Sequence, residues 1–222
     1  MLLAVDTSTA QIGLALYDGT QVPGEFVWHS GPHHTQELAP ALDELLKRAE
    51  IKINAITAVG VALGPGSFTS LRVGLAFVKG LVLSRHVPVV GVPTLDVVAA
   101  GVPVSDRKLG AVVQAGRGRL AVGWYHAEAN GWQAEGPATV TTAEELTSKI
   151  HKPVIICGEL SASDRQRLAR KFKNVTLSSP AQCVRRPGIL AELAWQKWEA
   201  GKTDALASLA PIYLHVAGGL PA

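Results

Sequence analysis

Cysteine and charge are both scarce in this chain. The two cysteines, Cys157 and Cys183, lie outside any Cys-x-x-Cys spacing. That is not the pattern of a disulfide scaffold, and it favours a reduced, cytoplasmic protein. Charged residues make up 18% of the 222 residues and hydrophobic residues 47%. This balance excludes a disordered chain and is typical of a compact globular protein.

Long apolar runs and a strong excess of one charge are also missing. The longest apolar run, residues 87–104, contains three prolines and Asp96, so it is a poor membrane span. The apolar start is interrupted by Asp6 and no basic segment precedes it, so we expect neither a signal peptide nor membrane association. The net charge of +3 is too small to argue for nucleic-acid binding by itself.

The most informative stretch is a glycine-rich turn, residues 64–72, with the sequence GPGSFTSLR. It follows the apolar residues 56–63, which are short and rich in β-branched side chains. This order is typical of a buried strand that enters a tight turn. Ser67 or Thr69 can then cap a helix that continues to about Arg85.

The helix expected over residues 68–85 is apolar on two sides. One stripe comprises Phe68, Leu71, Leu75, Val78 and Val82, and the other comprises Val73, Phe77 and Leu81. A helix that packs on one sheet needs a single apolar stripe, so the other stripe predicts a second helix or another chain as neighbour. The pattern alone leaves open which stripe faces the sheet.

Two glycines in the same helix support a close neighbour. Gly74 and Gly80 each cost roughly 1 kcal/mol relative to alanine inside a helix, and a backbone passing close by would explain them. We therefore predict a partner interface on this helix and on the preceding one, expected over residues 35–50. The predicted interface residues are Leu38, Leu42, Arg72, Val73, Gly74, Phe77, Gly80 and Leu81.

The order of the expected strands and helices predicts two successive lobes with the same arrangement, residues 1–104 and 105–222. Each lobe shows three strands, a helix, a strand, a helix and a strand, which is the pattern of a ribonuclease-H-like lobe. In the first lobe, strands are expected at 2–5, 11–17, 22–28, 56–63 and 87–92, and helices at 35–50, at 68–85 and from 94.

In the second lobe, strands are expected at 109–114, 120–126, 132–140, 154–157 and 175–177, and helices at 142–150 and 161–171. Thr142 and Glu145 have the spacing of a capping box. A last helix, at about 188–201, is expected to pack back on the first lobe. The fold class expected from this duplication is α/β, with mixed sheets flanked by helices.

Polar residues at the end of the first strand form a candidate phosphate loop. In ATPases with this arrangement, hydroxyl and backbone N–H groups such as those of Asp6, Thr7, Ser8 and Thr9 contact a phosphate, and the aspartate holds Mg²⁺. The alternative is that these side chains bond the backbone at a strand end. The corresponding stretch of the second lobe, residues 114–117, carries no carboxylate, which disfavours catalysis by the chain itself, and no catalytic residue is assigned.

Three further groups of residues are candidates for a metal site, a catalytic serine and a nucleic-acid contact. His29, His33, His34 and Glu37 resemble metal ligands, but Gly31-Pro32 separates the first two histidines, so a solvated helix start is favoured and no metal site is predicted. Ser67 lies outside a Gly-x-Ser-x-Gly motif and is expected to be a helix cap. The basic residues Arg165, Arg167, Arg170, Lys171, Lys173, Arg185 and Arg186 are expected to form a solvated face, with a contact to nucleic-acid phosphates as the alternative.

Asp6-Thr7-Ser8, the helical stretch from His33 to Leu46, and GPGSFTSLRVGLAFVKGL (residues 64–81) together resemble the TsaB (formerly YeaZ) family. The resemblance is specific over about residues 1–100 and rests on the Pro211–Leu214 ending beyond them. It implies the two-lobed fold of actin, Hsp70 and the sugar kinases. It also implies a cytoplasmic, non-catalytic subunit for N6-threonylcarbamoyl modification of adenosine 37 in tRNA, once filed with the M22 glycoproteases.

The resemblance also implies partners. They are a TsaD-like catalytic subunit, a TsaE-like ATPase, tRNA through the complex, and a second copy of the chain when it is alone. ATP or ADP with Mg²⁺ at a lobe or subunit interface is left open. The chain departs from the family at residues 113–121, which lack the usual acids and tyrosine.

Two other functions were considered, an ATP-binding enzyme of the sugar-kinase-like superfamily and a metallopeptidase. The resemblance implies that the catalytic paralogue binds metal through two histidines, and Thr94 and Val98 fill those positions here. These side chains suit packing and do not ligate a transition metal. The substitutions therefore argue against both the peptidase and the transferase chemistry.

Overall fold

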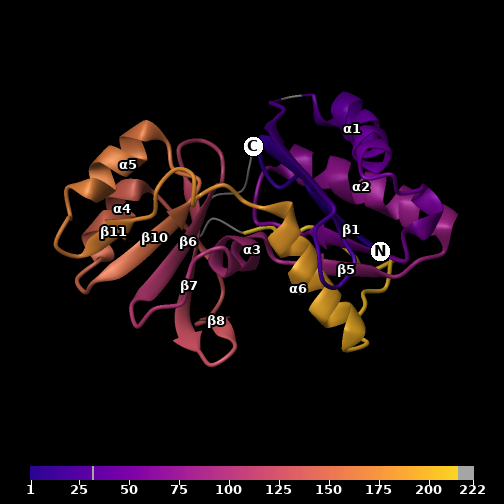
Figure 1. The fold of residues 1–222 in the computed structure, drawn as a ribbon. Coiled ribbons are helices and arrows are strands. Elements are labelled where there is room, and N and C mark those ends of the chain that lie inside the picture. Colours follow the sequence, from indigo (N-terminus) through magenta and orange to yellow (C-terminus); the bar gives the residue numbers. More distant parts are fainter. Residues whose placement is uncertain (32, 215–222) are drawn as a thin grey trace. The chain divides into compact units, whose positions relative to one another are not determined.

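The computed structural model of this chain describes residues 1–31 and 33–214. They form two compact units (Figure 1). The first unit contains Met1–Val97 and Arg185–Ile212, and the second is built on Val98–Val184. The chain thus leaves the first unit a few residues before the expected division at 104/105 and returns to it at Arg185.

The sheet of the first unit has five strands in the order β3-β2-β1-β4-β5. The first three strands form an antiparallel meander, and β4 and β5 run parallel to β1. The strands are β1 (Leu2–Asp6), β2 (Gln11–Tyr17), β3 (Gly24–His29), β4 (Ala58–Ala62) and β5 (Val89–Val92). All of them were expected; β2 has the expected bounds, and the ends of the other four are shifted.

Helices cover both faces of this sheet. One face carries α1 (His34–Arg48) and α2 (Phe68–Arg85), and the other carries α6 (Pro187–Glu199) (Figure 1). A 3₁₀ turn at Ile53–Ala55 precedes β4, and α3 (Thr94–Ala100) follows β5. The last helix, α6, packs on the sheet of the first unit, as expected.

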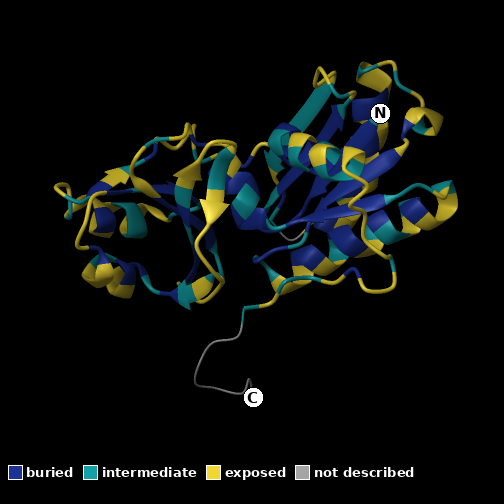
Figure 2. Ribbon diagram, turned by 90° about the horizontal axis from the view of Figure 1, so that it is seen from below, coloured by how far each residue is buried: buried dark blue, intermediate teal, exposed yellow. Residues whose placement is uncertain are grey.

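The sequence of β1 explains why two layers of helix are needed. Leu3 and Val5 point to the core under α1 and α2, whereas Leu2 and Ala4 point to the core under α6. Alternate side chains of a strand face opposite sides of its sheet, so a strand apolar at every position must be covered twice. In Figure 2 most of this sheet is accordingly dark blue, and the helices beside it are banded with blue and yellow, whereas the edge strand β3 is only half-buried.

The second unit repeats the strand order of the first. Its sheet has the order β8-β7-β6-β10-β11, which corresponds to β3-β2-β1-β4-β5, and β9 pairs with β7. The strands are β6 (Lys108–Gln114), β7 (Leu120–Glu128), β8 (Gly131–Ala134), β9 (Thr139–Thr141), β10 (Val154–Gly158) and β11 (Val175–Leu177). The single strand expected at 132–140 is wrong. Gly136-Pro137 interrupts the expected strand, because proline has no N–H to donate to a neighbouring strand. The residues on either side form two strands, β8 and β9, which pair separately with β7.

Two helices, α4 (Ala143–Lys149) and α5 (Ala162–Ala169), lie beside this second sheet. The predicted capping box is confirmed, because Thr142 accepts from Glu145 N and Glu145 bonds back to Thr142 N. A second capping box, Ser161 with Asp164, begins α5. Within residues 1–31 and 33–214, no helix is both long and apolar enough to cross a membrane.

The structure settles which stripe of α2 faces the sheet. Leu71, Leu75, Val78 and Val82 are buried, so the first stripe forms the core and the second lies at its edge. Phe68, assigned to the first stripe, is 53% exposed instead. It is the first residue of the helix and lies beyond the part that packs on the strands.

The two glycines of α2 have different surroundings, and one of them corrects the predicted interface. A Cβ at Gly74 would lie 2.0 Å from Thr7 Oγ1, whereas one at Gly80 would meet nothing within 4 Å. The close neighbour of Gly74 is therefore a loop of its own chain and not a partner. Gly80 is exposed, and no contact within the chain requires a glycine there.

This difference predicts opposite effects of one substitution. Gly80→Ala should raise the free energy of unfolding by up to about 1 kcal/mol, because alanine is the better helix former. Gly74→Ala should lower it by about 1–3 kcal/mol, because the added methyl group overpacks Thr7. Urea unfolding of the two variants measures both, and changes of the same sign would contradict this assignment.

Candidate functional site

The loop after β1, residues 6–9, lies in the interior of the first unit. Asp6, Thr7, Ser8 and Thr9 are each less than 5% exposed. A buried polar group must be hydrogen-bonded, and a buried charge must be paired, or folding is strongly penalised. The partners of these four side chains therefore show what the loop does.

Asp6 is paired with an arginine from the far end of the sequence. Arg185 Nε donates to Asp6 Oδ2 at 2.5 Å, and Asp6 Oδ1 accepts from Ser8 N at 2.8 Å. Arg185 Nη2 also donates to Thr9 Oγ1 at 3.1 Å. Both oxygens of the carboxylate are thus bonded within the chain, and Arg185 takes the position beside Asp6 that the phosphate-loop interpretation would give to a metal ion.

The next two residues of the loop bond the neighbouring segments. Thr7 Oγ1 donates to Ser70 O in the first turn of α2, at 2.8 Å. The hydroxyls of Ser8 and Thr94 lie 2.7 Å apart, and Thr94 Oγ1 accepts from Gly64 N at 2.9 Å. Thr94, which fills a position where the resemblance implies a metal-binding histidine, instead ties this loop to the glycine-rich turn.

The glycine-rich turn packs directly on the loop. Ser67 N donates to Ser8 O at 2.7 Å, and a Cβ at Gly66 would lie only 2.0 Å from that oxygen. Ser67 Oγ accepts from Ser70 N, so the predicted role of Ser67 as a helix cap is confirmed. The turn therefore supports the loop from one side, and these contacts favour the structural interpretation of residues 6–9 over the phosphate-loop interpretation.

Two of the candidate metal ligands, His34 and Glu37 in the first turn of α1, are also used inside the first unit. His34 Nε2 is hydrogen-bonded to Thr9 O at 2.8 Å, and Glu37 accepts from Trp28 Nε1 at 2.7 Å. The indole N–H of Trp28 holds the pKa of the Glu37 carboxyl below its usual range. In the described part of the chain, no three His, Cys, Asp or Glu residues are grouped so that they hold a metal ion.

The basic face expected on the second lobe is mostly taken up by other contacts. Arg185 is buried against Asp6, Arg186 is paired with Glu25, and Arg167 with Glu144. Arg165 Nη2 donates to Ser178 O at 2.6 Å. Arg170, Lys171 and Lys173 make no such side-chain contact with the residues that the structure describes. Because Arg185 is buried in the first unit, the seven residues do not form one face.

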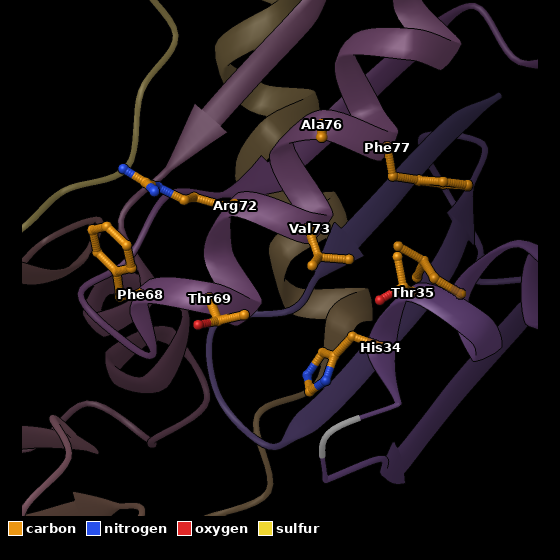
Figure 3. Close-up of a pocket in the computed structure, with 9 residues that line it drawn as sticks. His34, Thr35, Phe68, Thr69, Arg72, Val73, Ala76 and Phe77 are labelled. Atoms are coloured by element: carbon orange, nitrogen blue, oxygen red, sulfur yellow. The ribbon is translucent and has the colours of Figure 1, made fainter.

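An apolar groove lies between the N-terminal parts of α1 and α2, with a volume of about 490 Å³. Figure 3 shows Phe68 beside Arg72 at one end and Phe77 near the other, with His34 and Thr35 on the facing helix. The Arg72 guanidinium lies 3.8 Å from the centre of the Phe68 ring, a cation–π contact. The lining residues are His34, Thr35, Leu38, Phe68, Thr69, Arg72, Val73, Ala76 and Phe77.

The predicted interface overlaps with this groove in part. Arg72, Val73 and Phe77 line it, and Leu38 forms its buried floor. Leu42 is a core residue and Gly74 is buried against Thr7, so neither presents a surface. Leu81 packs at the edge of the core, and Gly80 is exposed outside the groove.

Several groove residues were not predicted from the sequence. Phe68 was grouped with the first stripe because its spacing matches that of Leu71 and Leu75, and it was not among the predicted interface residues. Thr69 and Ala76 carry no apolar signal strong enough to stand out. His34 and Thr35 were weighed only as a helix start, since their place opposite α2 depends on how the two helices pack.

A comparison with known families decides the identity. The model of the TsaD family, described as tRNA N6-adenosine threonylcarbamoyltransferase, matches residues 29–192. The chain belongs to the TsaD family, and within it to the TsaB (YeaZ) proteins. The resemblance seen in residues 1–100 is thereby confirmed.

Relatives of nearly full length support this. The tRNA threonylcarbamoyladenosine biosynthesis protein TsaB of Bacillus subtilis is 28% identical, over 97% of this chain and 94% of its own length. The Escherichia coli protein of that name is 27% identical, over 96% and 94%. A solved structure of YeaZ from Pseudomonas aeruginosa, 22% identical, has a TM-score of 0.76 over 96% of this chain and 99% of its own. It confirms the expected two-lobed fold of the actin and sugar-kinase class.

The buried pair predicts a large difference between two adjacent arginines. Arg185→Met should lower the free energy of unfolding by about 3–5 kcal/mol, because it leaves the Asp6 carboxylate buried without a counter-ion. Arg186→Met removes an exposed partner of Glu25 and should cost no more than about 1 kcal/mol. Denaturant unfolding measures both.

A double variant separates the loss of the pair from the loss of packing. Asp6→Asn combined with Arg185→Met should recover part of the stability lost in Arg185→Met, since no charge is then left unpaired. Equal losses for Arg185→Met and Arg186→Met, or no recovery in the double variant, would contradict the structural role of the pair.

Proposed function

We propose that this chain is a non-catalytic partner subunit for N6-threonylcarbamoyl modification of adenosine 37 in tRNA. It binds a TsaD-like catalytic subunit through the groove between α1 and α2. The groove is the observation that carries the proposal, together with the threonylcarbamoyladenosine biosynthesis named in its relatives.

The chemistry of the groove suits a protein partner. Phe68 is 53% exposed and lines the groove together with the exposed Ala76 and the half-buried Val73 and Phe77. Clustered apolar surface of this kind on a soluble protein marks an interaction site. Phenylalanine provides a large apolar contact, and Arg72 at the rim supplies the residue type that is enriched in interfaces.

The family match indicates which partner fits. The matched residues 29–192 include both α1 and α2, so a TsaD-like chain carries counterparts of these two helices. Two related chains can then pair through equivalent faces, as the identical subunits of a symmetric dimer do. When the catalytic subunit is absent, a second copy of this chain covers the groove in the same way.

The remaining components follow from the same proposal. A TsaE-like ATPase and tRNA join through the complex, and the assembly works in the cytoplasm. The two alternative functions gain no support from the contacts of residues 6–9. An ATP-dependent enzyme of this fold needs the carboxylate that Arg185 holds, and a metallopeptidase needs a ligand set that Thr94 and Val98 do not supply.

The test is reconstitution of the modification with purified TsaD-like and TsaE-like subunits, tRNA and the substrates. Modified adenosine should form only when this chain is added, and the chain alone should give none. Phe68→Ala should weaken binding to the TsaD-like subunit by at least about 2 kcal/mol, or about 30-fold, and reduce modification accordingly. Calorimetric titration measures the binding.

The matched control is Phe172→Ala, which removes a ring that is 76% exposed on the second unit. It should leave binding and modification unchanged, and both variants should retain the wild-type circular dichroism spectrum. Full modification without this chain would disprove the proposed function. Dependence on the chain together with wild-type binding by Phe68→Ala would instead disprove only the groove as the interface.

A further inference from the structure

Two thiols outside the groove lie close to each other in the second unit. Cys157 belongs to β10 and is buried, whereas Cys183 lies after β11 and is partly exposed. Their Sγ atoms are 3.8 Å apart. The proposed function uses neither of them, so their proximity calls for its own explanation.

The surroundings of the two sulfur atoms differ. Arg165 Nη1 lies 3.8 Å from Cys183 Sγ, and the guanidinium is held there by a bond of 2.6 Å from Nη2 to Ser178 O. Cys157 Sγ lies 3.6 Å from the carbonyl oxygen of Gln182, inside the fold. A positive charge beside a partly exposed sulfur is the environment of a reactive thiol, whereas a buried thiol is protected from direct attack.

We propose that Cys183 is a hydroperoxide-reactive thiol and that Cys157 resolves its oxidised form into an intramolecular disulfide. In the first step the Cys183 thiolate attacks one oxygen of hydrogen peroxide. The O–O bond breaks, Cys183 becomes a sulfenic acid, and hydroxide leaves and takes up a proton to form water. The sulfur is oxidised and the peroxide is reduced, so no further oxidant is needed.

In the second step the Cys157 sulfur attacks the Cys183 sulfur. The S–S bond forms, the S–O bond breaks, and the oxygen leaves as water with the Cys157 proton. A disulfide needs an S–S distance of about 2.05 Å. The two sulfur atoms, now 3.8 Å apart, must therefore move closer together before the bond can form. Residues 178–184 form turns outside the sheet, which allows this movement without breaking a strand.

The ionisation of the pair agrees with these roles. The hydrogen bond from Cys157 and the nearby Arg165 charge lower the pKa of Cys183 to about 6. The hydrogen bond with Cys183 and burial raise the pKa of Cys157. At neutral pH the thiolate is thus on Cys183, the sulfur that a small oxidant reaches first.

The experiment treats the reduced, purified full chain with hydrogen peroxide and follows it by intact mass and dimedone labelling. The wild type should lose two hydrogens and both alkylatable thiols. Cys157→Ser should gain one oxygen and form a dimedone adduct at Cys183. Cys183→Ser should react at least about tenfold more slowly than Cys157→Ser.

Two further measurements test the environment of Cys183. The initial rate at which the wild type loses alkylatable thiols should level off by about pH 7, because a thiol with a pKa near 6 is ionised there, whereas an ordinary thiol gains rate up to about pH 8.5. Arg165→Gln should slow the reaction and move this plateau to higher pH. Labelling of Cys157 before Cys183, or two thiols that remain alkylatable while free glutathione is oxidised, would overturn the proposal.

Discussion

The first unit depends on one buried ion pair, between Asp6 at the end of β1 and Arg185 just before α6. The two residues are 179 positions apart, and both side chains are at most 2% exposed. A charge can remain in such a place only with its partner, so the pair fixes where the returning chain meets the first sheet. From there α6 covers the apolar face formed by Leu2 and Ala4. The same contact places a guanidinium on the carboxylate that would otherwise be open to a metal ion.

The loop held by this pair also supports the groove. Thr9 O is bonded to His34 at the start of α1, and Thr7 Oγ1 bonds Ser70 in the first turn of α2. Because the N-terminal ends of both helices are bonded to the same loop, they are held at a fixed spacing. The space between them forms the groove. In the proposed function this loop forms the base of the protein-binding surface, and not a phosphate site.

Much of this architecture could be predicted from the sequence, because it depends on local patterns. The bounds of α2, β2 and β11 match the structure, and the capping box of α4 is confirmed. The errors concern contacts between distant residues. Arg185 was assigned to a basic surface because nothing near it in the sequence indicates Asp6, and Gly74 was assigned to a partner because Thr7 is not adjacent to it in the sequence. Four of the nine groove residues were predicted, since apolar spacing locates the helix but not the residue at which its packing on the sheet ends.

The central claim is that the chain works by presenting the groove between α1 and α2 to a catalytic partner. Photo-cross-linking tests this most directly, with a photoreactive amino acid in place of Ala76 in the groove or of Phe172 on the second unit. The chain is mixed with a purified TsaD-like subunit and irradiated, and the linked peptides are identified by mass spectrometry. The account predicts that position 76 links to the partner and that position 172 does not. Links from position 172 with none from position 76 would contradict it.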